Sequence, residues 1–121
     1  MAIIKPTIER WFTAPFVAER PALMTRIGQQ IRRTSVAGYT GCASAISTLN
    51  IADKIGVIRC PVLAISGRQD PSTTLAMHED IVRAIPGAEL AVLDPAAHLS
   101  NFEQTQAFND ALAGFLARVA R

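Results

Sequence analysis

The sequence predicts an α/β fold in which helices come first and a β-α-β-α unit with parallel strands follows. Residues 61–66 form a short apolar segment typical of a strand buried on both faces of a parallel sheet, and residues 88–93 are predicted to form the next strand. A helical pattern lies between them and another follows the second. Strand, helix and strand in this order form a βαβ unit. We therefore divide the chain into a helical segment, residues 1–52, and a sheet-containing segment, residues 53–121.

The helical segment begins with one or two predicted turns over residues 7–12, which a break at residues 13–15 ends. Pro21 suits the first turn of the next helix, because its fixed φ is already helical. Apolar residues then recur at every fourth position: Leu23, Ile27 and Ile31. The basic cluster lies largely outside this stripe, and we interpret it as a solvated helix face: Arg26, Arg32 and Arg33.

A third helix follows, for which either Thr34 or Ser35 can serve as the N-cap. Its apolar face carries Tyr39, Cys42, Ile46 and Leu49. Cys42 and Cys60 are too far apart to form a metal or redox motif, so we expect both to be small buried hydrophobes. Residues 50–59 then form a transition that holds a short turn of helix near Gly56.

The composition limits what the chain binds. It has 121 residues, enough for one domain, and half of them are hydrophobic, yet no apolar run approaches the roughly 20 residues of a membrane helix. The net charge of +2 provides no broad field for nucleic acid or anionic lipid. No metal-ligand spacing is visible, so we expect neither metal nor other cofactor. Since no signal peptide follows Met1, we expect a cytoplasmic protein.

The second segment supplies the remaining predicted elements. Residues 72–74 offer caps for a helix that runs to Ile85 and ends at Pro86-Gly87. Ser100 and Glu103 match the S-x-x-E capping box of a last helix. The apolar stripe of that helix consists of Phe108, Leu112, Phe115, Leu116 and Val119.

Two polar residues follow the predicted strands closely: Asp70 lies four residues after the first strand and His98 five after the second. Because parallel strands end at the same edge of a sheet, we expect the two side chains to meet there. A carboxylate that binds one imidazole nitrogen leaves the other to act as a base, which makes two-thirds of a nucleophilic triad. Asp94 is a rival acid, but Asp94-Pro95 favours a turn. His78 fits a solvated helix face beside acidic neighbours.

Residues 58–71 resemble the penultimate strand and acid loop of an α/β-hydrolase, and residues 93–104 resemble its last strand and histidine loop. Residues 9–13 and 36–46 resemble the helical cap of the 3-oxoadipate enol-lactonases, which act in bacterial breakdown of aromatic acids. The resemblance implies a carboxyl-terminal half, with residues 1–52 as a cap-like segment and the rest as core. It also implies hydrolysis of a small lactone or carboxylic ester, with catalytic His98 and Asp70 and with Trp11 lining the substrate pocket.

The sequence departs from that family at the nucleophile. In the family a serine precedes the acid on a G-x-S-x-G elbow, and no such motif occurs in the 121 residues. We therefore expect a fragment or half-length relative that is inactive alone. Two alternatives remain open: a non-catalytic oligomeric interaction module, and one half of a split hydrolase. Under each reading we expect a homo-oligomer or a missing amino-terminal half to cover the open sheet edge.

Overall fold

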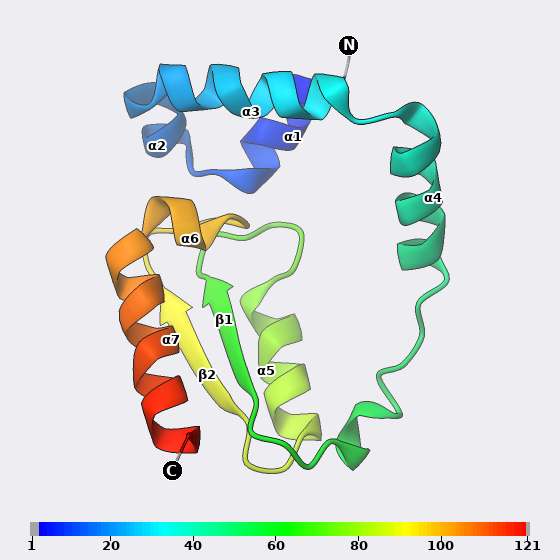
Figure 1. The fold of residues 1–121 in the computed structure, drawn as a ribbon, viewed down its shortest axis with the longest axis vertical. Coiled ribbons are helices and arrows are strands. Elements are labelled where there is room, and N and C mark those ends of the chain that lie inside the picture. Colours follow the sequence, from blue (N-terminus) through cyan, green and yellow to red (C-terminus); the bar gives the residue numbers. More distant parts are fainter. Residues whose placement is uncertain (1–2, 121) are drawn as a thin grey trace.

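The computed structural model describes residues 3–120, which form a βαβ unit beneath a group of helices (Figure 1). The helical segment contains α1 (Ile4–Trp11), α2 (Ala14–Glu19), α3 (Pro21–Arg33) and α4 (Val36–Ser47). A 3₁₀ turn, η1 (Ile55–Val57), leads into the second segment. That segment contains β1 (Leu63–Gly67), α5 (Leu75–Ala84), β2 (Glu89–Leu93), α6 (Ser100–Glu103) and α7 (Thr105–Val119).

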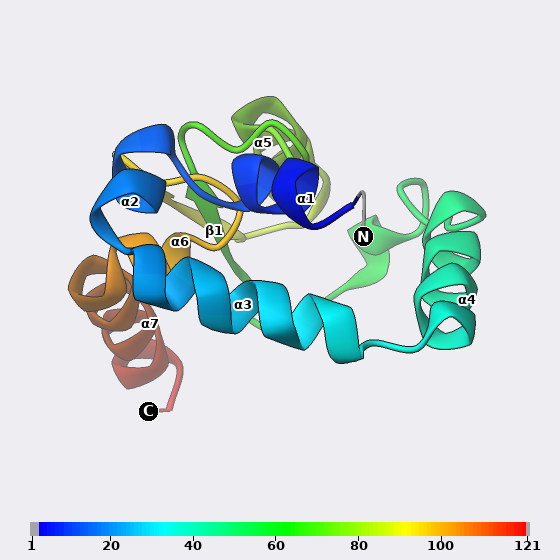
Figure 2. The same cartoon turned by 90° about the horizontal axis from the view of Figure 1, so that it is seen from above.

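The two strands are parallel, as the sequence predicts, with Leu63 opposite Glu89 and Gly67 opposite Leu93. Helices α5 and α7 lie on either side of this sheet (Figures 1 and 2). Helices α1, α2 and α3 lie beyond the ends toward which both strands point (Figure 1). The loops that follow β1 and β2 therefore lie between the sheet and the helical segment, where ligands collect in α/β folds.

A small apolar core joins the helical segment to the loop after β2. Phe12, Met24 and Ile27 are buried together, and Leu99 packs against them. The ring of Phe12 also meets the edge of Phe102 in α6, with ring centroids 6.2 Å apart. Burial of aromatic rings is a large source of packing energy. Helices α1 to α3 are thereby fixed on the loop that carries His98.

Helix α4 stands apart from this core in both views (Figures 1 and 2). Ser35 is its N-cap, since Gly38 N donates to Ser35 Oγ at 3.0 Å, which decides between the two predicted caps. Every residue from Val36 to Ser47 is exposed, although the helix is rich in apolar side chains. Cys42 and Cys60 are also exposed, so the prediction that they are buried is wrong. The reason is that α4 and the segment before β1 pack against little within residues 3–120.

Two further local predictions differ from the structure. The sequence predicts a break at residues 13–15 and no helix before Pro21, but residues 14–19 form the separate helix α2, because six residues are too few to show an apolar period. The predicted capping box is wrong as well: Leu99 is the N-cap of α6 and no side chain caps it. Glu103 closes α6, and its carboxylate binds partners outside that helix. Among residues 3–120, no helix has both the length and the apolar character needed to cross a bilayer.

Candidate active site

Asp70 and His98 meet above the carboxyl edge of the sheet. Each residue lies in the loop that follows a strand, and parallel pairing brings the two loops together. His98 Nδ1 lies 2.8 Å from Asp70 Oδ2, a hydrogen-bond distance. The structure thus brings together the two side chains that the sequence predicts to be acid and base.

The carboxylate of Asp70 is buried and fully engaged. Its Oδ1 accepts the backbone N–H groups of Ser72, at 2.7 Å, and Thr73, at 3.1 Å. Its Oδ2 accepts the Thr73 hydroxyl at 2.6 Å in addition to the imidazole. An aspartate that bonds to the backbone two and three residues ahead is an Asx turn. The sequence Asp-Pro-Ser-Thr therefore holds its own carboxylate in place.

The pKa of Asp70 lies below the ordinary value of an aspartate. Burial alone raises this pKa, because it penalises the charged form. Hydrogen bonds outweigh that effect, first those of the Thr73 hydroxyl and the His98 ring, then those of the Ser72 and Thr73 backbone. Asp70 is consequently an ionised carboxylate at neutral pH.

The charge on Asp70 determines the tautomer of His98. An ionised carboxylate only accepts hydrogen bonds, so Nδ1 must carry the proton that joins the two side chains. The lone pair of a neutral imidazole then resides on Nε2, which is the arrangement of a general base. About a third of the His98 side chain is exposed, so the ring is reachable from outside.

Two hydrogen bonds and a close approach at Gly67 hold the loop after β1 against the loop after β2. Gln69 N donates to Ala96 O at 2.9 Å, and Ala96 N donates to Gln69 Oε1 at 2.8 Å. A Cβ at Gly67 would lie 2.1 Å from Ala97 O, closer than any side chain permits. The chain has glycine where the acid loop passes the histidine loop. Neither this contact nor the role of Thr73 was predicted, although the Asx-turn composition of residues 70–73 could have indicated the latter.

The rival acid, Asp94, has a different surrounding. Its carboxylate accepts Arg68 Nε at 2.7 Å and Gln69 Nε2 at 2.8 Å, and the peptide bond between Asp94 and Pro95 is cis. His78, on α5, uses its Nδ1 within its own helix, 3.0 Å from Thr74 O. The structure therefore places neither residue in the Asp70–His98 pair.

Trp11, the predicted substrate contact, lies at the end of α1, where its carbonyl oxygen accepts Leu99 N at 3.0 Å. This bond brings Trp11 next to the residue that follows His98. Its side chain lines a largely apolar hollow of about 590 Å³ between α1, the end of α3 and α4. Other side chains that line the hollow are Ile31, Val36, Tyr39 and Cys42. The role of Trp11 in substrate binding stays a prediction.

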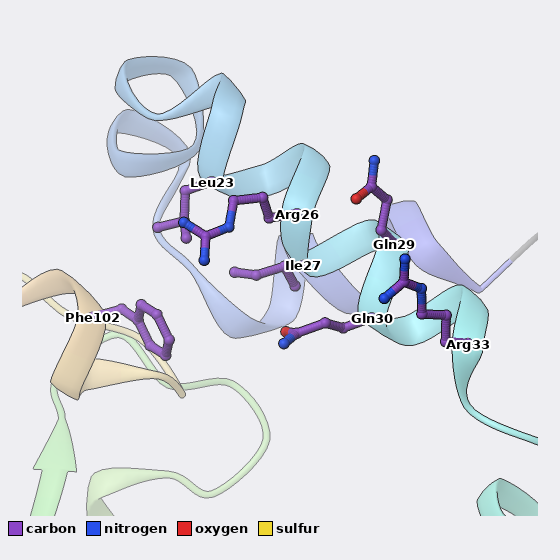
Figure 3. Close-up of a pocket in the computed structure, with 7 residues that line it drawn as sticks. All are labelled: Leu23, Arg26, Ile27, Gln29, Gln30, Arg33 and Phe102. Carbon is purple, nitrogen blue, oxygen red and sulfur yellow. The ribbon is translucent and has the colours of Figure 1, made fainter.

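A smaller cavity of about 250 Å³ separates α3 from α6, and Figure 3 shows the residues around it. Apolar side chains, among them Leu23 and Phe102, line the cavity together with four polar side chains of α3: Arg26, Gln29, Gln30 and Arg33. Both arginines are exposed, as is Arg32, which confirms the predicted solvated face.

Within residues 3–120, no cluster of three or more His, Cys, Asp or Glu side chains is arranged to hold a metal ion.

Comparison with known proteins finds enol-lactonases among the proteins similar to this chain. The chain is 34% identical to the 3-oxoadipate enol-lactonase 2 of Acinetobacter baylyi, over 96% of its own length and 43% of that protein. The crystal structure of the enol-lactonase from Burkholderia xenovorans LB400 superposes with a TM-score of 0.93 at 32% identity, over 96% of this chain and 44% of that one. Est816, an N-acyl homoserine lactone degrading enzyme, has a TM-score of 0.72 at 27% identity, over 89% of this chain and 44% of its own.

The chain thus spans less than half the length of the proteins that it matches. Its likeness to the enol-lactonases extends over nearly all of its own residues, the helical segment included. The family model for the alpha/beta hydrolase fold matches residues 6–105, which contain most of α1, all of α2 and α3, and the Asp70–His98 pair. The chain therefore belongs to the α/β-hydrolase family, of which it represents a carboxyl-terminal half similar to that of the 3-oxoadipate enol-lactonases.

Proposed function

We propose that this chain provides the base and the acid of a lactone or carboxylic ester hydrolase, with His98 as the general base and Asp70 as the residue that orients it. The observation that carries the proposal is the 2.8 Å hydrogen bond between Asp70 Oδ2 and His98 Nδ1. The lowered pKa of Asp70 supports it, because an ionised carboxylate stabilises the imidazolium that forms during catalysis.

The proposed reaction needs a serine hydroxyl beside His98 Nε2. The imidazole takes the hydroxyl proton while the serine oxygen attacks the ester carbonyl, and it then returns that proton to the leaving alkoxide. Water, activated by the same nitrogen, releases the acyl group from the serine. Since the 121 residues contain no G-x-S-x-G motif, the serine and the oxyanion donors come from outside them. Alone, the chain would have negligible triad hydrolysis.

A small lactone is the substrate class that we favour. Proteins whose names refer to 3-oxoadipate enol-lactone and to N-acyl homoserine lactone both match the chain, and a cyclic ester is common to their substrates. Trp11 would line the part of the pocket that the helical segment contributes. The proposal extends to a cytoplasmic role in the breakdown of aromatic acids, which the resemblance to the enol-lactonases implies.

The partner we propose is the amino-terminal portion of an α/β-hydrolase, joined to this chain or supplied separately. Within residues 3–120 the sheet has two strands, so β1 and β2 each have one unpaired edge. Exposed strand edges pair readily with further strands. Pairing there would extend the sheet and add the serine-bearing elbow next to the edge that carries His98.

A non-catalytic homo-oligomer is the second candidate, and the exposed apolar face of α4 favours it. Val36 and Ile46 are 74% and 71% exposed, which is unusual for side chains of this type on a helix. A second copy of the chain could cover this face, as could the amino-terminal portion of a hydrolase. In the second candidate the Asp70–His98 pair would be inherited without being used.

The test joins the amino-terminal portion of the Burkholderia xenovorans enol-lactonase to this chain and measures hydrolysis of 3-oxoadipate enol-lactone. We expect activity that Asp70→Asn and His98→Ala each reduce by about 10³-fold or more. Asp80→Asn and His78→Ala, both on α5, serve as matched controls that retain activity. Restoration of activity on mixing the two separate pieces would identify a split enzyme. A folded fusion whose activity survives His98→Ala would refute the proposal.

A further inference from the structure

The carboxylate of Glu103 connects the helical segment to the histidine loop. Its Oε1 accepts both the backbone N–H of Thr13, at 2.9 Å, and the Thr13 hydroxyl, at 2.5 Å. Its Oε2 accepts the backbone N–H of Ala97 at 2.5 Å. Ala97 immediately precedes His98, and Thr13 lies in the turn between α1 and α2. One half-buried side chain therefore links two segments that are 84 residues or more apart in sequence.

This contact needs a carboxylate. The three groups around Glu103 all donate, and a carboxylate has two oxygens that only accept. A glutamine of the same shape has one oxygen and one NH₂ group, so its NH₂ would face either Thr13 or the N–H of Ala97. Because the NH₂ group and the N–H group that it faces are both donors, no hydrogen bond forms between them, and a half-buried polar group is left unpaired.

A second hydrogen bond, between backbone groups, joins the same two segments. Leu99 N donates to Trp11 O at 3.0 Å, so the residue after His98 is attached to the end of α1. The residues on both sides of His98 are thus attached to the segment from Trp11 to Thr13. Ala97 is attached through Glu103, and Leu99 directly. Ala97 is 2% exposed, which makes this stretch of loop part of the packed interior.

We infer that Glu103 is a positioning residue, which sets the place of the His98 ring relative to the helical segment that would cover the substrate. Glu103 acts through the backbone of Ala97, whose N–H its carboxylate accepts. This inference rests on the proposed function for its effect on hydrolysis. Its structural part, the restraint on the histidine loop, holds without that function.

The structural part is tested by amide hydrogen exchange on this chain, comparing Glu103→Gln with the wild type. Loss of one of these bonds is expected to speed exchange about tenfold at Ala97 or at Thr13, whichever faces the NH₂ group, while amides between β1 and β2 keep their rates. Glu79→Gln, an exposed change on α5, is the matched control and should alter neither rate. Equal exchange at both Ala97 and Thr13 in wild type and Glu103→Gln would overturn the inference.

A milder variant guards against general unfolding of Glu103→Gln. Thr13→Val removes the hydroxyl donor and keeps the backbone N–H, so a smaller increase at Ala97 is expected. If Glu103→Gln speeds exchange throughout the sheet and Thr13→Val leaves Ala97 unchanged, Glu103 is merely a stabilising residue and the inference fails.

The catalytic part is tested in the fusion with the Burkholderia xenovorans amino-terminal portion. Misplacement of the base lowers kcat, so Glu103→Gln is expected to reduce kcat by about 10- to 100-fold with KM changed by less than about threefold. Unchanged kcat would overturn the inference. If His98→Ala also leaves the activity unchanged, the proposed function has failed, whereas an effect of His98→Ala without one of Glu103→Gln refutes only the positioning role.

Discussion

The hydroxyl of Thr73 lies 2.6 Å from Asp70 Oδ2, the same oxygen that accepts the hydrogen bond from His98 Nδ1. The Thr73 oxygen is also 3.4 Å from His98 Nδ1, so threonine, aspartate and histidine form one compact cluster. The hydroxyl donates to the carboxylate and thereby stabilises its charged form. Thr73 thus stabilises the charged Asp70 carboxylate to which the His98 ring is bound.

Thr73→Val is expected to raise the pKa of Asp70 toward the ordinary value of an aspartate. Valine matches threonine in shape but has no donor, and the Thr73 hydroxyl is the strongest of the hydrogen bonds that lower this pKa. The change should also cost about 1 kcal/mol of unfolding free energy. A titration of the Asp70 carboxyl carbon by NMR measures the pKa. Thr40→Val, which removes a hydroxyl bonded only within α4, is the control.

The lowered pKa of Asp70 makes stability depend on pH in the acid range. The unfolded chain binds a proton at Asp70 more readily than the folded one, so unfolding free energy rises with pH there. The stabilisation is fully present above the unfolded pKa, about 4, and is lost as the pH falls through the lower folded value. Urea denaturation between about pH 7 and pH 2 measures this, and Asp70→Asn should flatten the profile. Profiles of equal slope for both proteins would contradict the assignment.

The sequence predicted the parallel strands and the Asp70–His98 pair, because apolar runs followed by polar loops determine which side chains reach one sheet edge. It also limited the N-cap of α4 to Thr34 or Ser35, where a local motif suffices, and the structure shows Ser35. It could not predict the partners of Glu103, since S-x-x-E describes a local motif and the actual donors lie in a distant turn and the preceding loop. Nor could it predict the exposure of Cys42, because burial depends on what packs against α4.

Gly67→Ala is expected to damage the site by forcing the two loops apart. The added methyl would meet Ala97 O at 2.1 Å and Ala96 O at 2.6 Å, and backbone oxygens cannot rotate away as a flexible side chain can. Such overpacking costs about 1–3 kcal/mol or more. Chemical denaturation measures the loss, and the NMR signal of the His98 ring reports the displaced loop.

Gly41→Ala is the matched control for that change. A Cβ at Gly41, inside α4, meets nothing within 4 Å, and alanine favours a helix by up to about 1 kcal/mol over glycine. We expect equal or slightly greater stability. If both variants lose stability alike, the close approach at Gly67 is not the cause.

Association of the isolated chain should depend on α4. Its apolar side chains remain exposed among residues 3–120, and Ile46 is 71% exposed, so contact with a second copy would remove apolar surface from water. Sedimentation velocity is expected to give a mass above the 13.0 kDa of one chain. Ile46→Lys should shift the distribution toward the monomer, because a charge resists burial. Asn109→Lys, on the exposed side of α7, adds the same charge elsewhere and should leave the mass unchanged. A wild-type chain that sediments as a monomer would contradict self-association, and an oligomer that persists in Ile46→Lys would place the interface away from α4.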